Sequence, residues 1–336
     1  MSGRLAPHHA SRRSDRLLKV LADHDQVLVV THDNPDPDAI ASSFGLQYLL
    51  KQKGIESVIV YENELEKANA LKMLEIFEID MRPAGDVASL GTEDWAVLVD
   101  VQKGNSNVTD LATDEVAVID HHEWGGDDGG CRFVDIRPGV GACSTLIAEY
   151  FFDNEINVPR NIATALLYGI FMDTDDLTRG VAILDIDMFY RLYSLSDISK
   201  ITELKGNQIS REDLSDYAKA FQTVEVYGPV AFLYLDNCND SLLGAAGDIV
   251  ITIAGVDIVV AYSPRDQGIK FSIRSITDGC RANELVRFIL EGLGFGGGHD
   301  RMAGGFLPGE KLAEDRSLHT FVRHRAISFL ENQENI

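Results

Sequence analysis

Short apolar runs alternate with helix-like segments through the first two hundred residues of the chain. The runs are rich in valine and isoleucine, as the interior strands of a parallel sheet are, and the segments between them have helical periodicity. This rhythm predicts an α/β fold with a mostly parallel sheet and helices on both faces. The expected strands are 26–32, 57–62, 94–100 and 115–121, the expected helices are 39–54 and 66–79, and residues 141–200 are expected to be mainly helical.

The pattern changes after residue 200. Residues 201–221 are polar and of mixed charge, which is typical of a linker plus a helix between domains. Strand-like alternation follows, so we expect a second, smaller α/β domain with a mixed sheet. Its expected strands are 224–235, 248–264 and 269–276, and its expected helices are 282–292 and 319–332. The predicted boundaries are a disordered arm at 1–14, a first domain at 15–200, a linker at 201–222 and a second domain at 223–336.

Composition narrows the class of protein. A chain of 336 residues with 45% hydrophobic and 25% charged residues can form two ordinary soluble cores. We expect no membrane span and no secretory signal, hence a cytoplasmic protein whose four cysteines are reduced structural thiols. The net charge of −23 makes duplex DNA a poor partner. A small anionic substrate stays compatible, because surface charge is screened beyond about 8–10 Å.

Four apolar segments each end in carboxylates or imidazoles. In an open α/β sheet, ligands bind at the carboxyl ends of the strands. The combination therefore predicts a two-metal site for the hydrolysis of phosphate esters. The residues at these ends are His32, Asp36 and Asp38 after the run 26–32, Asp100 at the end of 94–100, Asp120, His121 and His122 at the end of 115–121, and Asp173 at the end of the helical run 163–173.

The chemistry of this set favours particular cations. Hard divalent cations prefer carboxylates, and Mn²⁺ also accepts imidazole. Four carboxylates and two imidazoles are enough for two metals that share one carboxylate. Because the set is rich in acids and contains no cysteine, structural zinc is disfavoured. We expect Mn²⁺ first, with Mg²⁺ or Co²⁺ as alternatives to it. The metal-ligand candidates are His32, Asp36, Asp38, Asp100, His121 and Asp173.

Simpler explanations exist for single members of the set. Asp38 directly precedes an apolar helical run and could serve only as the N-cap of that helix. His121 and His122 are neighbours, and successive strand residues face opposite ways. Both can reach one site only if the strand has ended before them.

Ordered motifs along the chain resemble those of the DHH phosphoesterase family. HDNPDPDAIASS (32–43), Asp100, DHH (120–122) and GIFMDTDD (169–176) resemble its four motifs in order. FSIRS (271–275) and GGGHDRMAGG (296–305) resemble the DHH-associated C-terminal domain. The likeness covers most of residues 25–310. It is greatest to the short two-domain members, which are oligoribonucleases acting on very short RNAs, pAp phosphatases and cyclic-dinucleotide-linked phosphodiesterases, because the chain lacks the extra length of RecJ-type exonucleases.

The fourth motif departs from the family pattern. The family commonly has Asp-Thr-Gly and an aromatic residue there, whereas this chain has Asp173 followed by Thr-Asp-Asp-Leu. Asp173 still aligns as the ligand. Asp175 and Asp176 are alternative candidates that we expect to be solvated loop acids, and their charge bears on substrate preference.

The resemblance implies roles for the first domain. His32, Asp36 and Asp100 would hold one metal, and Asp38, Asp100, His121 and Asp173 the other, with Asp100 bridging. A water or hydroxide between two such metals is the expected nucleophile. The implied catalytic residues are His122, which would contact the scissile phosphate, and Asp120, which would orient an imidazole.

The second domain would bind the substrate. The glycines of the GGGH stretch let backbone N–H groups approach a phosphate, although a glycine-rich turn is the simpler reading. The candidate substrate-binding residues are Arg274, Gly297, Gly298, His299 and Arg301. The implied reaction is cleavage of short single-stranded RNA or linear dinucleotides such as pApA to 5′-mononucleotides, with pAp as a further substrate.

Two other functions stay open. A phosphoanhydride hydrolase would act on pyrophosphate or polyphosphate, but related inorganic pyrophosphatases have a different C-terminal domain, and the GGGH stretch argues against that reading. A non-catalytic nucleotide-binding module would be expected to lack some ligands, and all six are present. A homodimer is expected by resemblance.

Overall fold

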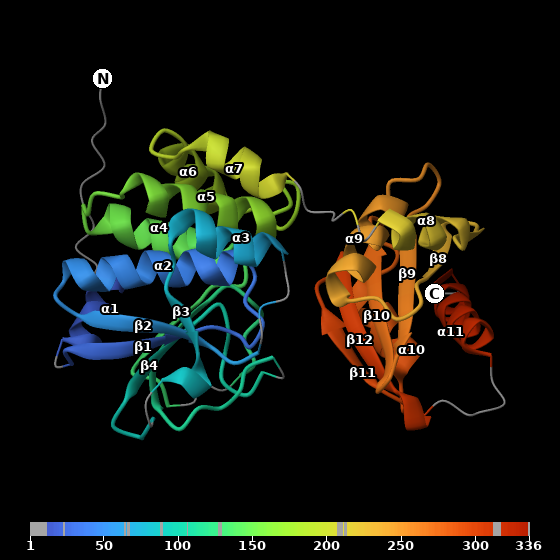
Figure 1. The fold of residues 1–336 in the computed structure, drawn as a ribbon, viewed down its shortest axis with the longest axis horizontal. Coiled ribbons are helices and arrows are strands. Elements are labelled where there is room, and N and C mark those ends of the chain that lie inside the picture. The colour runs from blue at the N-terminus through green and yellow to red at the C-terminus, as the bar shows by residue number, and fades with distance from the viewer. Residues whose placement is uncertain are drawn as a thin grey trace. The chain divides into compact units, whose positions relative to one another are not determined.

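The computed structural model describes residues 12–22, 24–63, 65, 68–87, 90–105, 107–126, 130–206, 211, 214–311 and 317–334. The chain divides into two compact units, Met1–Gln208 and Ile209–Ile336, drawn in Figure 1. The expected arm at 1–14 lies largely outside the described residues, although Arg13 and Ser14 begin the first helix. The predicted linker at 201–222 contains the end of helix α7 and all of helix α8.

The first unit is built on a parallel sheet, as predicted. Its order is β3-β2-β1-β4-β5-β6, and every neighbouring pair is parallel. From β1 to β3 the chain adds strands toward one edge of the sheet, and from β4 to β6 it adds them toward the other edge. The direction of strand addition therefore reverses between β1 and β4. Such a reversal opens a crevice at the carboxyl ends of the strands. The strands are β1 Gln26–Val30, β2 Glu56–Tyr61, β3 Met81–Pro83, β4 Trp95–Val99, β5 Asp114–Asp120 and β6 Phe133–Ile136.

The helices of this unit pack on one face of the sheet (Figure 1), whereas the sequence pattern predicted helices on both faces. The opposite face packs against Val87, Leu90, Val108 and Leu111, which lie outside the α-helices. The reason is that the β4–β5 and β5–β6 connections contain no helix among their described residues. The elements are α1 Arg13–Leu21, α2 Pro37–Gln52, α3 Ala68–Phe77, α4 Cys143–Asp153, α5 Arg160–Asp173, α6 Ile183–Tyr193, α7 Ile198–Lys205 and the 3₁₀ turn η1 Ala84–Asp86.

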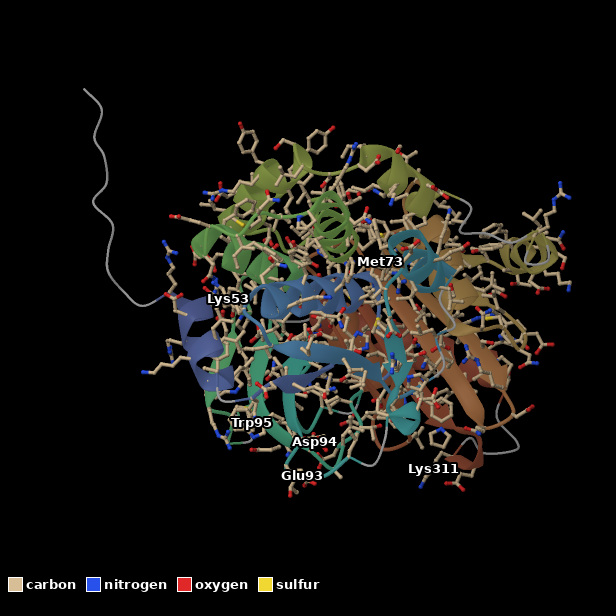
Figure 2. All side chains as sticks on the ribbon, turned by 60° about the vertical axis from the view of Figure 1, so that its left-hand side comes forward. Lys53, Met73, Glu93, Asp94, Trp95 and Lys311 are labelled. Atoms are coloured by element: carbon tan, nitrogen blue, oxygen red, sulfur yellow. The ribbon has the colours of Figure 1, made fainter. Side chains whose placement is uncertain are left out.

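Aromatic packing marks the amino end of β4. Glu93, Asp94 and Trp95 lie together there (Figure 2). The rings of Trp95 and His24 meet edge to face, with 3.4 Å between their centroids, and the Arg132 guanidinium lies 4.3 Å from the Trp95 ring. The opposite, carboxyl end of the same strand leads into Asp100.

The second unit has a mixed sheet, again as predicted. Its order is β11-β12-β10-β9-β8-β7, with β8 and β9 parallel and the other neighbours antiparallel. Helices α8 and α9 share a core with one face, and α10 and α11 share a core with the other. The elements are α8 Leu214–Gln222, β7 Glu225–Tyr227, β8 Val230–Tyr234, α9 Asp240–Val250, β9 Ile258–Arg265, β10 Gly268–Ser275, α10 Ala282–Leu290, β11 Phe295–Gly298, β12 Met302–Pro308, η2 Gly309–Lys311 and α11 Leu318–Glu334.

The predicted strand at 248–264 is wrong in its first part. Residues 240–250 form α9, and β9 begins only at Ile258. The side chain of Asn239 accepts a hydrogen bond from the N–H of Leu242 at 2.8 Å and so starts the helix. A short apolar run fits both periods, and here the cap decides for the helix. No described helix is both long enough and apolar enough to span a bilayer.

Candidate metal centre

Three strands of the first unit deliver polar residues at the point where the strand order reverses. His32 follows β1, Asp100 follows β4 directly, and Asp120 ends β5. Because β5 ends there, His121 and His122 both lie beyond the strand, and their ring centroids are 4.4 Å apart. Asp100 is buried and has a φ of 61°, a left-handed conformation that residues other than glycine seldom adopt.

Asp36 and Asp38 serve different helices. Asp36 is the N-cap of α2, and its Oδ1 accepts hydrogen bonds from the N–H groups of Asp38 and Ala39 at 3.0 and 3.1 Å. The carboxylate of Asp38 instead accepts from the N–H groups of Cys143 and Ser144 at 2.6 and 2.9 Å, at the start of α4. The alternative in which Asp38 caps its own helix is therefore wrong. The positive end of α4 stabilises a carboxylate at this point.

The six predicted ligands fall into two groups, and a third group that contains Asp100 and His121 joins them. In each group, one ligand atom from every residue lies within 4.8 Å of the others. Nε2 of His32 is 4.0 Å from Asp100 Oδ2, and Nε2 of His121 is 3.4 Å from Asp100 Oδ1. The groups are His32, Asp36 and Asp100, and Asp38, His121 and Asp173.

The His121 ring is placed so that it could hold a cation between these residues. Its Nδ1 lies 3.1 Å from the carbonyl oxygen of Val140, which can only accept, so Nδ1 carries the hydrogen and neutral imidazole has its lone pair at Nε2. That Nε2 is buried without a hydrogen-bond partner and lies 3.0 Å from Asp173 Oδ2. Asp100 Oδ1, also buried, lacks a hydrogen-bond partner too. In neutral His121 this lone pair would face carboxylates, and a divalent metal that accepts both oxygen and imidazole donors would satisfy them; without metal, a proton on Nε2 does so.

The pKa values of the metal-free cluster show how strongly its charges interact. Burial, and then the negative charge of Asp38, raise the pKa of Asp100 well above its usual value. Burial and the charge of Asp173 raise the pKa of Asp38 to about 7. For His121 burial alone would lower the pKa, but the carboxylates of Asp100 and Asp173 outweigh it and raise the pKa well above normal. Without metal, the cluster therefore retains protons.

Asp120 orients the imidazole of His122. One oxygen of Asp120 accepts from the backbone N–H of His121 at 2.7 Å and lies 2.8 Å from Nδ1 of His122. Its other oxygen accepts from Nε2 of Gln102 at 2.7 Å, and Gln102 also accepts from the N–H of Gly125. Gln102 was not among the residues predicted from the sequence, although it lies only two positions beyond Asp100. Burial lowers the pKa of His122, but Asp120 outweighs it and raises the pKa to about 9.

Asp185, which was also not predicted, supports His121 through the loop that contains Val140 and Gly141. The carboxylate of Asp185 is fully buried and accepts from the N–H groups of Gly141 and Ala182 at 2.9 and 2.7 Å. Gly141 follows Val140, whose carbonyl contacts His121. An acid at the third position of a helix is a known capping signal. The sequence alone does not show that Asp185 also accepts a hydrogen bond from a distant loop.

The two extra acids of the fourth motif belong to none of the ligand groups. Asp175 and Asp176 are exposed, as expected for solvated loop acids, and Asp176 forms an ion pair with Lys205. Three consecutive residues, Asp175, Asp176 and Leu177, have positive φ angles of 48°, 56° and 66°. This left-handed turn ends the segment just after Asp173.

The predicted substrate-binding arginines lie in the second unit. Arg274 on β10 is mostly buried, forms an ion pair with Asp248 and donates to Ser272 Oγ at 2.9 Å. Arg301 donates through Nη2 to Asp278 at 2.6 Å, whereas its Nη1 is buried without a hydrogen-bond partner. Arg274 is therefore already engaged in this structure, and Arg301 retains donor capacity.

The glycine cluster is a strand hairpin, where the simpler reading expected a turn. Gly297 and Gly298 belong to β11, which pairs with β12. The N–H of His299 donates to the carbonyl of Met302 at 2.7 Å and closes the hairpin. Gly298 has a φ of 135°, and a Cβ there would lie 2.7 Å from Ala303 Cα, so only glycine fits.

Comparison with known proteins identifies both units. The model of the DHH family N-terminal domain matches residues 26–170, and the model of the DHHA1 domain matches residues 228–318. The chain is a DHH-family protein. Its DHH domain contains every ligand candidate except Asp173, which lies three residues beyond the matched range, and its DHHA1 domain contains the glycine hairpin.

Individual relatives of this DHH-family protein vary in coverage. An uncharacterized protein of Methanocaldococcus jannaschii is 30% identical over 84% of this chain and 58% of its own length. A probable manganese-dependent inorganic pyrophosphatase of Streptococcus thermophilus is 28% identical over 44% of this chain and 48% of its own length. The chain thus spans about half the length of these relatives. The crystal structure of an exopolyphosphatase-related protein from Bacteroides fragilis has the same fold, with a TM-score of 0.78, 18% identity and coverage of 96% of this chain and 97% of that one.

Proposed function

We propose that this protein is a divalent-metal-dependent phosphoesterase that cleaves short oligoribonucleotides or linear dinucleotides such as pApA to 5′-mononucleotides, with pAp as a further substrate. The observation that carries the proposal is that the buried Asp100 belongs to one ligand group and lies 3.4 Å from His121 of the other. Two cations that share one carboxylate suit an in-line displacement at phosphorus.

The proposed ligands follow the two groups. His32, Asp36 and Asp100 hold one cation, and Asp38, Asp100, His121 and Asp173 hold the other. When bound, the cations would lower the pKa of a water molecule and neutralise charge on the phosphate. We favour Mn²⁺, with Mg²⁺ and Co²⁺ as alternatives, because the donors combine four carboxylates with two imidazoles.

Residues of the chain itself position the substrate. His122 is 35% exposed, against 6% for His121, so its imidazole is accessible to a phosphate oxygen. Asp120 is a positioning residue, because its buried carboxylate fixes the His122 ring through Nδ1. In the DHHA1 domain, the backbone of Gly297 and Gly298 and the side chains of His299, Arg301 and Arg274 would bind a second phosphate or the sugar end.

Phosphoanhydride hydrolysis is the second candidate. The relative named as a manganese-dependent inorganic pyrophosphatase favours it. That alignment covers 150 residues, however, which is too short to include both matched domains. The glycine hairpin of the DHHA1 domain supports a substrate with a further group to bind.

Product analysis tests the proposal. The purified chain is incubated with Mn²⁺ and, separately, with pApA, a five-nucleotide RNA, pAp and pyrophosphate. We expect AMP from pApA, reduced by more than about 100-fold in Asp100→Ala, because a ligand should matter at least as much as its supporting residues. Asp176→Ala, which removes a nearby exposed acid, should retain activity.

Two outcomes would overturn the proposal. Phosphate released from pyrophosphate alone would make the protein a phosphoanhydride hydrolase. Binding of AMP without turnover of any of the four compounds would make it a nucleotide-binding module.

A further inference from the structure

Helices α2, α4 and α5 pack against one another in the first unit (Figure 1). Helix α2 supplies Asp38 from its first turn, and α5 supplies Asp173 as its last residue. His121 Nε2 lies 4.0 Å from Asp38 Oδ2 and 3.0 Å from Asp173 Oδ2, and the three residues form one ligand group. The separation of α2 and α5 therefore sets the distance between the two carboxylates of this group.

Gly169 lies where α5 meets the other two helices. A Cβ at this position would overlap Oγ of Ser144, and it would lie 2.9 Å from Oδ1 of Asp38 and 3.1 Å from Cβ of Ala41. The backbone does not require glycine here, because Gly169 lies inside α5 without a positive φ, and alanine is the better residue in a helix interior. Glycine at this position therefore serves the close approach of α5 to Asp38.

The carboxylate of Asp38 has little freedom to turn away from an added methyl group. It is 1% exposed, and the N–H groups of Cys143 and Ser144 donate to its two oxygens at 2.6 and 2.9 Å. The side chain of Ser144 is itself fully buried. An alanine at position 169 would thus be accommodated by a shift of α5 away from α2 and α4.

Such a shift would reach the second carboxylate of the group. Gly169 and Asp173 are one helical turn apart on the same face of α5. Helical side chains lean toward the amino end of their helix, so the side chain of Asp173 lies over the turn that contains Gly169. A displacement of α5 at Gly169 would therefore carry Asp173 away from Asp38.

We propose that Gly169 is a positioning residue that sets the gap between Asp38 and Asp173 and thereby selects the size of the cation that they bind. The inference rests on the metal centre of the proposed function and deepens it, because it concerns which cation that centre accepts. Bonds to oxygen are about 2.0–2.1 Å long for Mg²⁺ and about 2.3–2.6 Å for Ca²⁺. Close packing of α5 favours the smaller ion, and a displaced α5 favours the larger one.

Calorimetric titration of the full-length chain with Mg²⁺ and, separately, with Ca²⁺ tests this role. Gly169→Ala should weaken Mg²⁺ binding by about tenfold, the lower end of the range for residues that support a metal ligand, and should weaken Ca²⁺ binding less. The ratio of the two affinities decides the question, because a general structural loss would lower both equally.

A second variant removes the obstacle that a Cβ at position 169 meets first. Gly169→Ala combined with Ser144→Ala lacks the Ser144 hydroxyl, so it should recover part of the Mg²⁺ affinity that Gly169→Ala loses. If Gly169→Ala alone does not fold, the double variant is compared with Ser144→Ala by the same ratio.

Gly45→Ala is the matched control. Gly45 lies on α2 where that helix meets α4 and α5, and a Cβ there would lie 2.9 Å from Cγ2 of Ile147 and 3.1 Å from Cδ2 of Leu166. These neighbours are the ends of apolar side chains, and Gly45 is about 10.5 Å along the helix from Asp38. Whatever its effect on stability, the variant should keep the wild-type ratio of Mg²⁺ to Ca²⁺ affinity.

Two results would overturn the positioning role. One is an equal loss of Mg²⁺ and Ca²⁺ affinity in Gly169→Ala, and the other is wild-type affinity for both ions. A change of the ratio in Gly45→Ala as large as in Gly169→Ala would also overturn it, because the effect would then not depend on contact with Asp38.

The two proposals can fail separately. If the wild type releases no AMP from pApA but Gly169→Ala loses Mg²⁺ affinity selectively, the phosphodiesterase proposal falls and the positioning role stands. If pApA is cleaved and Gly169→Ala loses affinity for both ions equally, the positioning role falls and the phosphodiesterase stands.

Discussion

Two buried carboxylates of the first unit show how the surroundings of a single residue decide its charge. Asp135 on β6 accepts from Arg137 through Nε and Nη2 and from the hydroxyl of Tyr150, and it also pairs with Arg13. Burial raises the pKa of Asp135, but these donors outweigh it and hold the pKa below its usual value. Asp100 is equally buried among acids and has a raised pKa. Asp135 is therefore structural and charged, whereas Asp100 is held in its protonated form when no cation is bound.

The environment of Asp135 predicts a pH effect on stability. A carboxyl whose pKa is lower in the folded chain stabilises the fold above its unfolded pKa, about 3.9, and loses this effect as the pH falls through the folded value. Asp135→Asn should therefore lower the free energy of unfolding by about 3 kcal/mol at pH 7. The gap to wild type should narrow below about pH 4. Urea unfolding in EDTA between pH 7 and pH 3 measures it.

Asp114→Asn is the control for this comparison. Asp114 forms a similar 2.7 Å pair with Arg132, but both side chains are partly exposed, so its loss should cost less than about 1 kcal/mol. A gap between Asp135→Asn and wild type that is equally large at pH 3 and pH 7 would contradict the assignment of the lowered pKa.

At the scale of elements, the start of α6 supports His121 of the candidate metal centre without contributing a ligand. Asp185 holds Gly141, and the preceding carbonyl of Val140 contacts Nδ1 of His121. The link thus runs from a helix terminus through a loop to an imidazole. Supports of this kind fix the orientation and tautomer of a metal-binding histidine.

Asp185→Ala should therefore weaken Mn²⁺ binding. We expect a loss of about tenfold in affinity, since supporting residues contribute 10- to 100-fold. Unpaired buried N–H groups should also lower the free energy of unfolding by about 2 kcal/mol. Mn²⁺ titration and urea unfolding in EDTA measure the two effects separately.

Asp187, on the exposed side of the same helix, offers the comparison. It pairs with Arg191 one turn away, so Asp187→Ala should change stability by less than about 0.5 kcal/mol and leave Mn²⁺ affinity unchanged. If Asp185→Ala loses stability but binds Mn²⁺ as the wild type does, the Val140 contact does not support the metal.

The sequence allowed the elements with a clear period to be predicted. Valine-rich runs and helical spacing were enough for the parallel sheet and for the mixed sheet. They did not predict that helices cover only one face of the first sheet, because a loop in place of a crossover helix gives no periodic signal. Residues 240–250 were missed because their apolar run suits either structure until the cap at Asn239 is considered.

Some residues of the candidate site could likewise be predicted from the sequence, and others could not. Residues that end strands or helices could be found from position alone, since parallel strands bring their carboxyl ends to one edge. Gln102 and Asp185 could not, because each acts through a partner distant in sequence. The contact of Asp38 with the start of α4 also spans more than a hundred residues, so the sequence suggested the wrong helix for it.

At the scale of the whole molecule, metal binding should stabilise one unit and not the other. The ligand groups lie entirely in the first unit. A ligand that binds only the folded state adds stability by mass action, about 2.7 kcal/mol for one site at a hundred times its Kd. The second unit contains none of these ligands.

Differential scanning calorimetry should thus show a selective shift. We expect Mn²⁺ to raise the melting temperature of the first unit by several degrees relative to EDTA and to leave the second unit unchanged. Asp100→Ala should abolish the shift. A melting profile that neither EDTA nor added Mn²⁺ alters would count against the metal centre as a whole.

The backbone conformation of Asp100 bears on which residue evolution would keep at this position. A φ of 61° costs an aspartate about 1 kcal/mol, and glycine would adopt it without strain. Glycine would also remove one acid from a crowded, buried cluster. In a lineage that had abandoned the reaction, selection for stability alone would favour glycine at this position. Under the proposed function, an aspartate there marks continued use of the reaction, and its loss in a descendant would be an early sign that the protein had changed its role.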